Sequence, residues 1–348
     1  MPDAAPLIIA PDRTLTLEDW ASVVDGRQVQ VEPVTLAAMD RGFDAAQARA
    51  AKDRTYGVGT GFGPMVRVDI PPGEVEALQY NLVRSHAAGL GRPYSARLAR
   101  GILLARLQNL SRGRSAVRGE LAALCAGALN AEIAPMIPRK GGVGASGDLV
   151  QLAHLGMLLI GEGPCWAAGR QADAATALAA AGLTPLRLKF RDGLSIVNGT
   201  SAMTAQGAAA VLAMGRLIEL VVAMTALMAE ITGLDPAAFG EALNGAKLHP
   251  GQHDVAARLR ARLEGSSRLG AAHEGPKGDG GRPMQEHYSI RCAPQIIGPM
   301  SESLELAARI VTGELNSVND NPVFDPRAAR PCTAATSTAS TSPSPWTR

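Results

Sequence analysis

The longest apolar run in the chain, from Ala202 to Ile231, limits the folds open to it more than any other feature. Ala, Val, Leu and Met occur on almost every side of the run, which is far longer than a β-strand. A helix that is apolar all round is buried in a core or crosses a membrane. Arg216 and Glu219 leave no uncharged stretch of transmembrane length inside it. The run therefore predicts a long, buried core helix and no membrane partner.

The rest of the composition favours further helices. Only 3% of the 348 residues are aromatic, beside 38 glycines and many Ala and Leu, whereas strands are rich in aromatic and β-branched residues. Apolar residues at helical spacing predict a helix opened by residues 71–74 that runs to about residue 88, two helices between 96 and 134, and another over 300–314. Thr16, followed by acidic residues, supplies a helix start. We expect a mainly α fold.

Charge and cysteine usage exclude several classes of protein. The chain carries 34 Lys+Arg against 32 Asp+Glu and has no basic stripe interleaved with aromatics, so a nucleic-acid partner is not expected. The 4 cysteines form no CxxC or Cys/His cluster, which argues against a zinc site or a disulfide framework. The first ten residues lack the pattern of a signal peptide. These features suit a cytoplasmic protein.

Two short motifs match the patterns of known binding sites, but the residues around them argue against both kinds of site. Residues 142–147 fit the GxGxxG spacing of a dinucleotide loop, but prolines precede them where a central strand is required. Asp148 and Gln151 instead predict a helix start with a capping box. His249 and His253 have the spacing of two metal ligands, yet Pro and Gly lie between them and no Glu follows the first His. We expect neither a nucleotide nor a metal.

The segment from Gly141 to His154 reads Gly-Gly-Val-Gly-Ala-Ser-Gly-Asp-Leu-Val-Gln-Leu-Ala-His and resembles the signature of the histidine and aromatic amino acid ammonia-lyase family. The resemblance implies that Ala145, Ser146 and Gly147 cyclise into a 4-methylidene-imidazol-5-one (MIO) group, with no external cofactor. The residue types suit this chemistry, because a glycine nitrogen is an unhindered nucleophile and serine can lose its hydroxyl to leave an electrophilic methylene. Asp148 would support MIO formation.

Two further blocks extend the resemblance towards the N-terminus. The segment that begins at Tyr56, Tyr-Gly-Val-Gly-Thr-Gly-Phe-Gly, resembles the family's tyrosine loop, in which the Tyr removes the substrate β-proton. Gly59 stands where a polar residue, often Asn, is expected. Ser85 and His86 match the pair that binds substrate in histidine-specific members, although some tyrosine lyases keep the same pair. For His86 taken alone, a packed core histidine is an equally good interpretation.

Three further blocks extend the family resemblance towards the C-terminus. Asn198, in an Asn-Gly-Thr block, would hydrogen-bond the MIO carbonyl and the substrate amine. Gln285, Tyr288 and Arg291 match a Gln-x-x-Tyr-Ser-x-Arg block, in which Tyr288 and Arg291 share one helical face. The planar fork of Arg291 suits the substrate carboxylate, while Gln285 also lines the substrate site. The Asn319–Pro322 turn matches a block to which we assign scaffolding alone.

The resemblance implies an elongated antiparallel helical bundle with a smaller mixed N-terminal region that carries the MIO and tyrosine loops. We expect a catalytic region over 1–200, an incomplete helical bundle over 201–326 and an aberrant, disordered tail over 327–348. The expected reaction eliminates ammonia from an aromatic L-amino acid, with histidine to trans-urocanate first and tyrosine to p-coumarate second. A 2,3-aminomutase and an inactive truncated member remain alternatives. Family members are homotetramers, in which the apolar run would pack between subunits.

The tail, from Arg327 to Arg348, is a run of Ser, Thr, Ala and Pro without periodicity. Family members run considerably longer, and a Gly-Gly-Asn-Phe-His-Gly block follows their Asn-Asp-Asn-Pro turn closely. Back-translation of Cys332 to Thr341 permits Val-His-Gly-Gly-Asn-Phe-His-Gly-Gln-Tyr when reading starts one base earlier and Ser340 uses its AGY codons. The third bases of these codons can be chosen freely, but the bases that the genetic code fixes agree with the shifted sequence at every position. The tail thus predicts a frameshift after about Arg330.

We therefore expect weak or no activity and poor tetramer formation from the printed chain, and recovery of both when the frame is restored, because the missing helices would complete neighbouring subunits' sites. Sequencing of the genomic DNA checks the premise. An uninterrupted frame whose codons are incompatible with the one-base shift would refute it.

Overall fold

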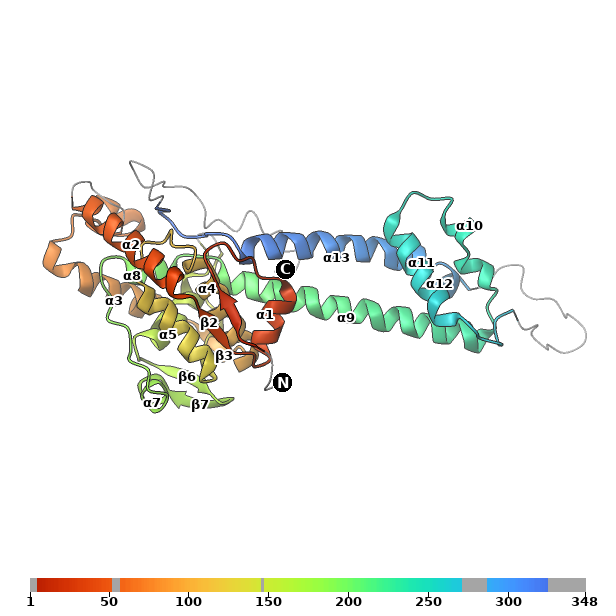
Figure 1. Ribbon diagram of the computed structural model, residues 1–348, viewed down its shortest axis with the longest axis horizontal. Coiled ribbons are helices and arrows are strands. Elements are labelled where there is room, and N and C mark those ends of the chain that lie inside the picture. The colour runs from red at the N-terminus through yellow and green to blue at the C-terminus, as the bar shows by residue number, and fades with distance from the viewer. Residues whose placement is uncertain (1–4, 52–56, 145–146, 271–286, 325–348) are drawn as a thin grey trace, which may run out of the picture. The chain divides into compact units, whose positions relative to one another are not determined.

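The computed structural model describes residues 5–51, 57–144, 147–270 and 287–324, and helices dominate it (Figure 1). This confirms the prediction of a mainly helical fold. The helices are α1 (Leu17–Val24), α2 (Pro33–Ala50), α3 (Val75–His86), α4 (Ala96–Leu110), α5 (Gly119–Asn130), α6 (Leu149–Leu159), α7 (Ala174–Ala180), α8 (Asp192–Val197), α9 (Ser201–Thr232), α10 (Glu241–Asn244), α11 (Pro250–Leu263), α12 (Tyr288–Arg291) and α13 (Ala293–Leu315). Short 3-10 helices cover Gly63–Arg67, Pro72–Glu74 and Pro236–Phe239.

The strands are short and form separate small sheets. They are β1 (Leu7–Ile9), β2 (Val29–Val31), β3 (Leu90–Pro93), β4 (Ile133–Pro135), β5 (Pro138–Lys140), β6 (Pro164–Ala167) and β7 (Arg170–Asp173). β1 pairs in parallel with β2, β3 pairs antiparallel with β5, and β4, β6 and β7 form an antiparallel sheet in that order. The prolines before the GxGxxG segment lie in β4 and β5, each at a sheet edge, so this segment does not follow a central parallel strand.

The chain divides into two compact units. The first comprises Met1–Ala209 and Ile310–Arg348, and the second comprises Ala210–Arg309. All the strands lie in the first unit. The expected domains ran consecutively along the chain and therefore did not include this return to the first unit at Ile310. The spacing of side chains along one helix does not show which segments of the chain pack beside it.

Helix α4 is the centre of the first unit. Every residue from Ala99 to Leu110 is buried, and α1 and α5 pack against the helix. Four of these buried residues are polar or charged, namely Arg100, Arg106, Gln108 and Asn109. Buried polar groups need hydrogen-bond partners, so the segments around α4 must supply acceptors and donors at defined places.

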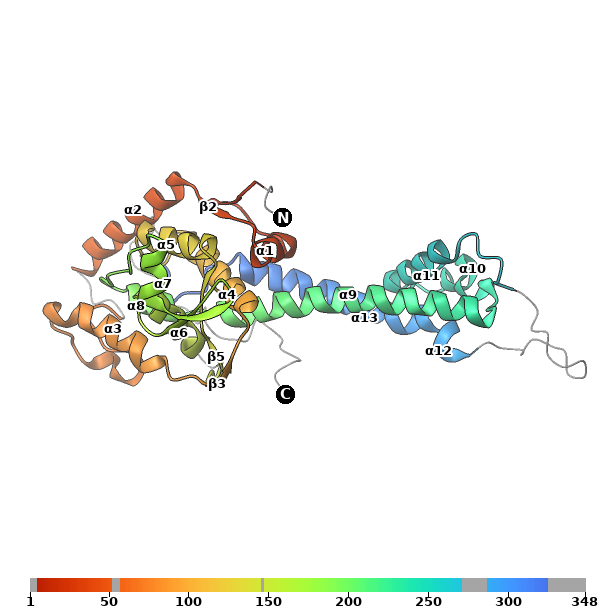
Figure 2. The same cartoon turned by 90° about the horizontal axis from the view of Figure 1, so that it is seen from below.

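A second group of helices lies beside this core. α3, α6 and α8 pack against one another in all three pairs, and Figure 2 shows them together. The start of α1 follows the prediction, since Thr16 accepts a hydrogen bond from Asp19 in a capping box. Local sequence therefore sets the start of α1, while packing decides which helices meet at α8.

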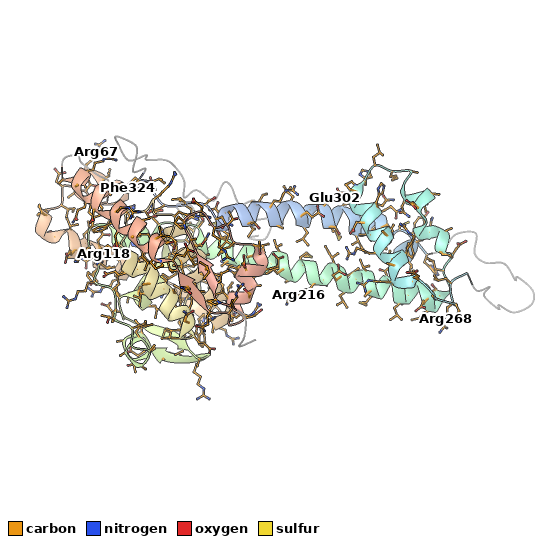
Figure 3. All side chains as sticks on the ribbon, viewed as in Figure 1. Arg67, Arg118, Arg216, Arg268, Glu302 and Phe324 are labelled. Carbon is orange, nitrogen blue, oxygen red and sulfur yellow. The ribbon has the colours of Figure 1, made fainter. Side chains whose placement is uncertain are left out.

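The second unit holds most of α9, and it corrects the expectation of a buried helix. Ile218, Val222, Ala226 and Ala229 face a cluster that includes residues of α11 and α13. The opposite side is exposed and apolar, at Leu217, Leu220, Val221, Met224, Leu227, Met228 and Ile231. The described part of the unit covers one side of the helix, so sequence hydrophobicity overstated its burial within a single chain. Arg216 also lies on the exposed side (Figure 3).

One stretch, Asp192–Thr232, is long and apolar enough to cross a membrane by length and composition. Helices of soluble proteins pass the same test, and Arg216 and Glu219 interrupt this one. The predicted tail, 327–348, lies outside the described residues.

Candidate active site

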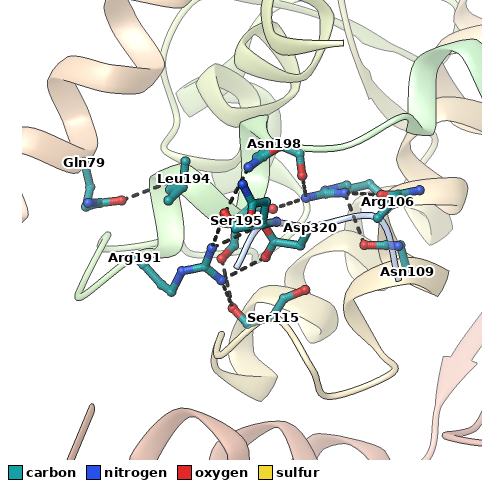
Figure 4. Close-up of polar contacts among 11 residues, drawn as sticks. Gln79, Arg106, Asn109, Ser115, Arg191, Leu194, Ser195, Asn198 and Asp320 are labelled. Carbon is teal, nitrogen blue, oxygen red and sulfur yellow. Dashed lines mark hydrogen bonds and ion pairs between the residues drawn. The ribbon is translucent and has the colours of Figure 1, made fainter. Parts of the chain in front are cut away.

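Asn198 follows the last turn of α8 and is buried in the first unit. Its main-chain N–H donates to the carbonyl of Leu194 at 2.9 Å. Its side-chain Nδ2 donates to the carbonyl oxygen of Asn321 at 3.0 Å (Figure 4). Because a carbonyl only accepts, this contact fixes which end of the amide faces Asn321. Oδ1 is buried and has no hydrogen-bond partner among the described residues, so it remains able to accept one.

Gly147, the last residue of the predicted MIO tripeptide, lies directly against the residue that follows Asn198. A Cβ placed on Gly147 would lie 2.5 Å from the carbonyl oxygen of Gly199, and the φ angle of Gly147 is 91°. Only glycine fits both conditions. The N–H of Asp148 donates to the same carbonyl at 2.7 Å. Ala145 and Ser146 themselves lie outside the described residues.

The side chain of Asp148 corrects the predicted capping box. It makes no cap to α6 and instead accepts from the N–H of Met203 at 2.8 Å, in the first turn of α9. The unpaired N–H groups at the start of α9 attract the carboxylate more than its own helix does. Burial raises the pKa of Asp148 to about 6, against the opposing effect of these N–H donors. Asp148 thus ties the tripeptide to α9.

Gly57, the second residue of the tyrosine loop, packs against α8. Tyr56 lies outside the described residues, but a Cβ on Gly57 would lie 2.3 Å from Cδ2 of Leu194 in α8. Gln79 of α3 bridges the two segments, since its Nε2 donates to the carbonyl of Gly57 at 3.2 Å and its Oε1 accepts from the N–H of Leu194 at 3.0 Å. The residue after Tyr56 is therefore fixed against the helix that ends at Asn198.

Ser85 and His86 occupy the last turn of α3. Nδ1 of His86 lies 2.9 Å from the carbonyl oxygen of Leu82 and 3.2 Å from Oγ of Ser85. Oγ of Ser85 donates to the same carbonyl at 3.2 Å. Within the described residues, neither side chain has a hydrogen bond outside α3. His86 is half-buried, not a packed core histidine.

Tyr288 and Arg291 belong to the second unit, where both lie on α12. Cζ of Arg291 lies 4.1 Å from the centroid of the Tyr288 ring, so the two side chains share a face of the helix as the spacing predicted. Such a stack of a guanidinium on an aromatic ring is stabilising. The Tyr288 side chain is 68% exposed. Gln285 lies outside the described residues.

Two buried arginines, Arg106 and Arg191, complete the surroundings of Asn198, and no sequence motif singles out either of them (Figure 4). Arg191 forms an ion pair with Asp320 at 2.9 Å and donates to the carbonyl of Asn321 at 3.2 Å. Arg106 donates to the carbonyl of Asn198 at 2.7 Å. The only signal for Arg106 was a charge inside the apolar α4 run, and apart from Asn109 its partners are distant in sequence. The Asn319–Pro322 turn thus contacts Asn198 and both arginines.

The pair of histidines with metal-ligand spacing is not assembled into a cluster. His249 occupies the N-cap position of α11 without a side-chain capping bond, and Nε2 of His253 contacts the carbonyl of Lys247. Over the ranges that the structure describes, no group of three or more His, Cys, Asp or Glu could hold a metal ion.

The described surroundings of the tripeptide fit an MIO group. Gly147 has a conformation open to glycine alone, and its neighbour Gly199 leaves no space for a side chain. The buried Oδ1 of Asn198 can accept a hydrogen bond beside them. These features provide the tight backbone packing that a cyclised tripeptide requires and one hydrogen-bond acceptor that a substrate amine requires.

The helical fold and this arrangement define a member of a known enzyme family. A family model described as aromatic amino acid lyase matches residues 15–343, and the chain belongs to that family. It is 41% identical over 315 residues to the histidine ammonia-lyase of Koribacter versatilis, a match that covers 90% of this chain and 60% of the relative. The chain therefore spans about 60% of the length of that curated relative.

Solved structures agree with this assignment. Phenylalanine aminomutase from Pantoea agglomerans matches with a TM-score of 0.89 and 30% identity, covering 95% of this chain and 66% of that one. Histidine ammonia-lyase from Trypanosoma cruzi matches with a TM-score of 0.83 and 28% identity, covering 97% and 63% respectively. Ammonia-lyases and aminomutases thus share this fold.

Proposed function

We propose that the protein is a carbon–nitrogen lyase that eliminates ammonia from an aromatic L-amino acid, with L-histidine as the substrate and trans-urocanate as the product. The contact between Gly147 and Gly199 supports this proposal, because Gly199 directly follows Asn198, whose buried Oδ1 is a free acceptor. The histidine ammonia-lyase relatives and the adjacent Ser85 and His86 support histidine over tyrosine.

In this proposal the cofactor is an MIO group formed from Ala145, Ser146 and Gly147, which supplies an electrophile that no ordinary side chain offers. Asn198 holds the amine of the substrate through Oδ1, which accepts a hydrogen bond from it. Asp148, anchored at the start of α9, keeps Gly147 in the conformation that cyclisation needs.

The remaining residues bind the substrate and move its proton. Tyr56 removes the β-proton at its phenolic oxygen, which requires nearby donors or a cation, because tyrosine ordinarily has a pKa of about 10. Arg291 holds the carboxylate with two parallel hydrogen bonds. Tyr288 stacks on Arg291 and positions the amine, while Ser85, His86 and Gln285 contact the aromatic ring.

An assay of purified, frame-restored protein tests the proposal. Histidine and tyrosine are offered separately, and urocanate and p-coumarate are followed by absorbance. Faster formation of urocanate supports the histidine assignment; p-coumarate alone would replace it with tyrosine ammonia-lyase. Absence of both products from both substrates would contradict the lyase.

A 2,3-aminomutase is the second candidate, because the phenylalanine aminomutase from Pantoea agglomerans shares the fold over 95% of this chain. Such an enzyme returns the ammonia to the β-carbon. Chromatography of the products separates the two reactions, since a β-amino acid replaces the arylacrylate.

We also propose a cytoplasmic homotetramer. The exposed apolar side of α9, from Leu217 to Ile231, supports association, because isolated monomers rarely expose so many large apolar side chains together. Light scattering of the frame-restored protein measures the mass in solution, and a monomeric mass would contradict the tetramer.

Substituting Arg291→Lys is expected to be costly although it keeps the charge. A single ammonium cannot reproduce two parallel bonds to a carboxylate, so kcat/KM should fall by the equivalent of about 1.5–3 kcal/mol. Steady-state kinetics measure the change. Arg262→Lys is the control, because this arginine binds Glu219 at the surface of the same unit and should leave kcat/KM unaltered. Unchanged kinetics in Arg291→Lys would remove the residue from the site.

A further inference from the structure

Arg106 is wholly buried, and its guanidinium binds acceptors that carry no charge. It donates to Oδ1 of Asn319 at 3.0 Å, to Oδ1 of Asn109 at 3.2 Å, to the carbonyl of Asn198 at 2.7 Å and to the carbonyl of Ser195. A buried cation costs free energy unless it is paired. Burial lowers the pKa of Arg106 to about 10, so it remains charged at neutral pH.

This arrangement is poorly explained by stability alone. Neighbouring buried positions of α4 hold leucine, and a well-packed apolar residue often stabilises a core at least as well as a buried charged group. What the guanidinium achieves is local: it binds the main-chain carbonyls of Ser195 and Asn198 together at the end of α8. It thereby ends the helix at a defined residue.

The same guanidinium lies against Gly199. A Cβ on Gly199 would be 2.1 Å from Nη1 of Arg106, so the main chain at Gly199 is in close contact with the arginine. The carbonyl of Gly199 meets Gly147 and accepts from the N–H of Asp148. Gly199 is thus in contact with Arg106 and also with the end of the tripeptide.

The side chain of Asn198 is held separately from its main chain. Its Nδ2 binds the carbonyl of Asn321, to which Arg191 also donates. With Nδ2 engaged there, Oδ1 is the atom left to accept. Arg106 holds the main chain of Asn198, and Arg191 supports the partner of its amide.

We infer that Arg106 is a positioning residue of the proposed lyase site, which acts through Asn198 and Gly199. Its guanidinium sets where Oδ1 of Asn198 meets the substrate amine and keeps Gly199 against the tripeptide. This inference rests on the proposed function, and it adds a residue that does not touch the substrate.

The test compares Arg106→Lys with Arg100→Lys in the frame-restored protein. Arg100 is a matched control, because it is buried on the same helix and donates to two main-chain carbonyls, those of Leu129 and Val23, each at 2.9 Å. Lysine keeps the charge but loses the fork in both variants. We expect Arg106→Lys to lower kcat by about tenfold to a hundredfold with little change in KM, because small displacements of reacting groups are costly. Arg100→Lys should retain kcat within about twofold.

A double-mutant cycle with Asn198→Ala shows whether Arg106 acts through Asn198. We expect Arg106→Lys to lower kcat/KM no further once Asn198 is alanine, whereas residues that act independently have effects that multiply. Multiplying effects, or equal losses in Arg106→Lys and Arg100→Lys, would overturn the inference.

Amide hydrogen exchange of the segment from Ser195 to Ser201 supplies a readout that needs no activity. Exchange should be faster in Arg106→Lys than in Arg100→Lys, because the carbonyls that end α8 are released. If the parent protein converts no amino acid, the proposed function fails. Hydrogen exchange still shows whether Arg106 holds the end of α8. Equal exchange in both variants would overturn it.

Discussion

Ser146→Ala is expected to abolish turnover of the frame-restored protein while leaving the fold intact. Alanine has no β-hydroxyl to lose, so the electrophilic methylene cannot form, and no other residue supplies an equivalent group. Removal of a group on which the whole reaction depends costs many orders of magnitude in rate. Product absorbance measures turnover, and far-UV circular dichroism measures the helices.

Mass spectrometry makes this expectation independent of the substrate chosen. The peptide that contains Ala145 to Gly147 should be two water molecules lighter than its sequence in the parent protein, because cyclisation and loss of the serine hydroxyl each release one. Ser146→Ala removes the second loss. Ser303→Ala is the control, since Ser303 is exposed on α13 and its hydroxyl donates to the carbonyl of Pro299 in the same helix. Activity of the parent's magnitude in Ser146→Ala would exclude the MIO mechanism.

Asp320→Ala is expected to have the largest effect on stability. Asp320 and Arg191 form an ion pair whose side chains are both 0% exposed, at 2.9 Å and with a second bond at 3.2 Å. Truncating the aspartate leaves a buried arginine without its carboxylate, which costs about 3–5 kcal/mol. The free energy of unfolding in urea, followed by fluorescence of Trp20 in the same unit, measures this loss.

The matched comparison is an ion pair at the surface of the first unit. Arg84 and Glu162 form a two-bond pair at 2.6 and 3.0 Å, but their side chains are 50% and 35% exposed. Glu162→Ala should therefore cost only about 0.2–1 kcal/mol. If the two substitutions cost the same, the buried pair would not be what holds the Asn319–Pro322 turn. In that case Asn198 would have to be positioned by other contacts.

Local features of the sequence were sufficient for much of the helical architecture. The capping box at Thr16 and the spacing of apolar residues between 96 and 134 correspond to α1, α4 and α5. These signals are reliable because a helix start and its apolar face are decided by residues within one or two turns. The same reasoning failed for Asp148, whose carboxylate found stronger donors at α9, far along the chain.

The pattern of blocks also placed Gly147 and Asn198 in one site before any contact was known, and the proximity of Gly147 to Gly199 agrees with it. The burial of α9 was misjudged, because hydrophobicity records a preference for an apolar environment but not which molecule provides it. The predicted roles of all the site residues, among them Tyr56, Asn198 and Arg291, stay predictions.

By itself, the sequence determined the helical class, the family and the order of its functional blocks, because each is written in short runs of residue types. Only the tertiary structure decided which side chains hold those blocks together. Apart from Asn109, which is three positions from Arg106, the groups that Arg106, Arg191 and Gln79 bind lie between 22 and 213 positions away in the chain. A main-chain carbonyl is the same group at every residue, so no residue type marks it as a partner. The contacts that position Asn198 exist only once α4, α8 and the Asn319–Pro322 turn have packed.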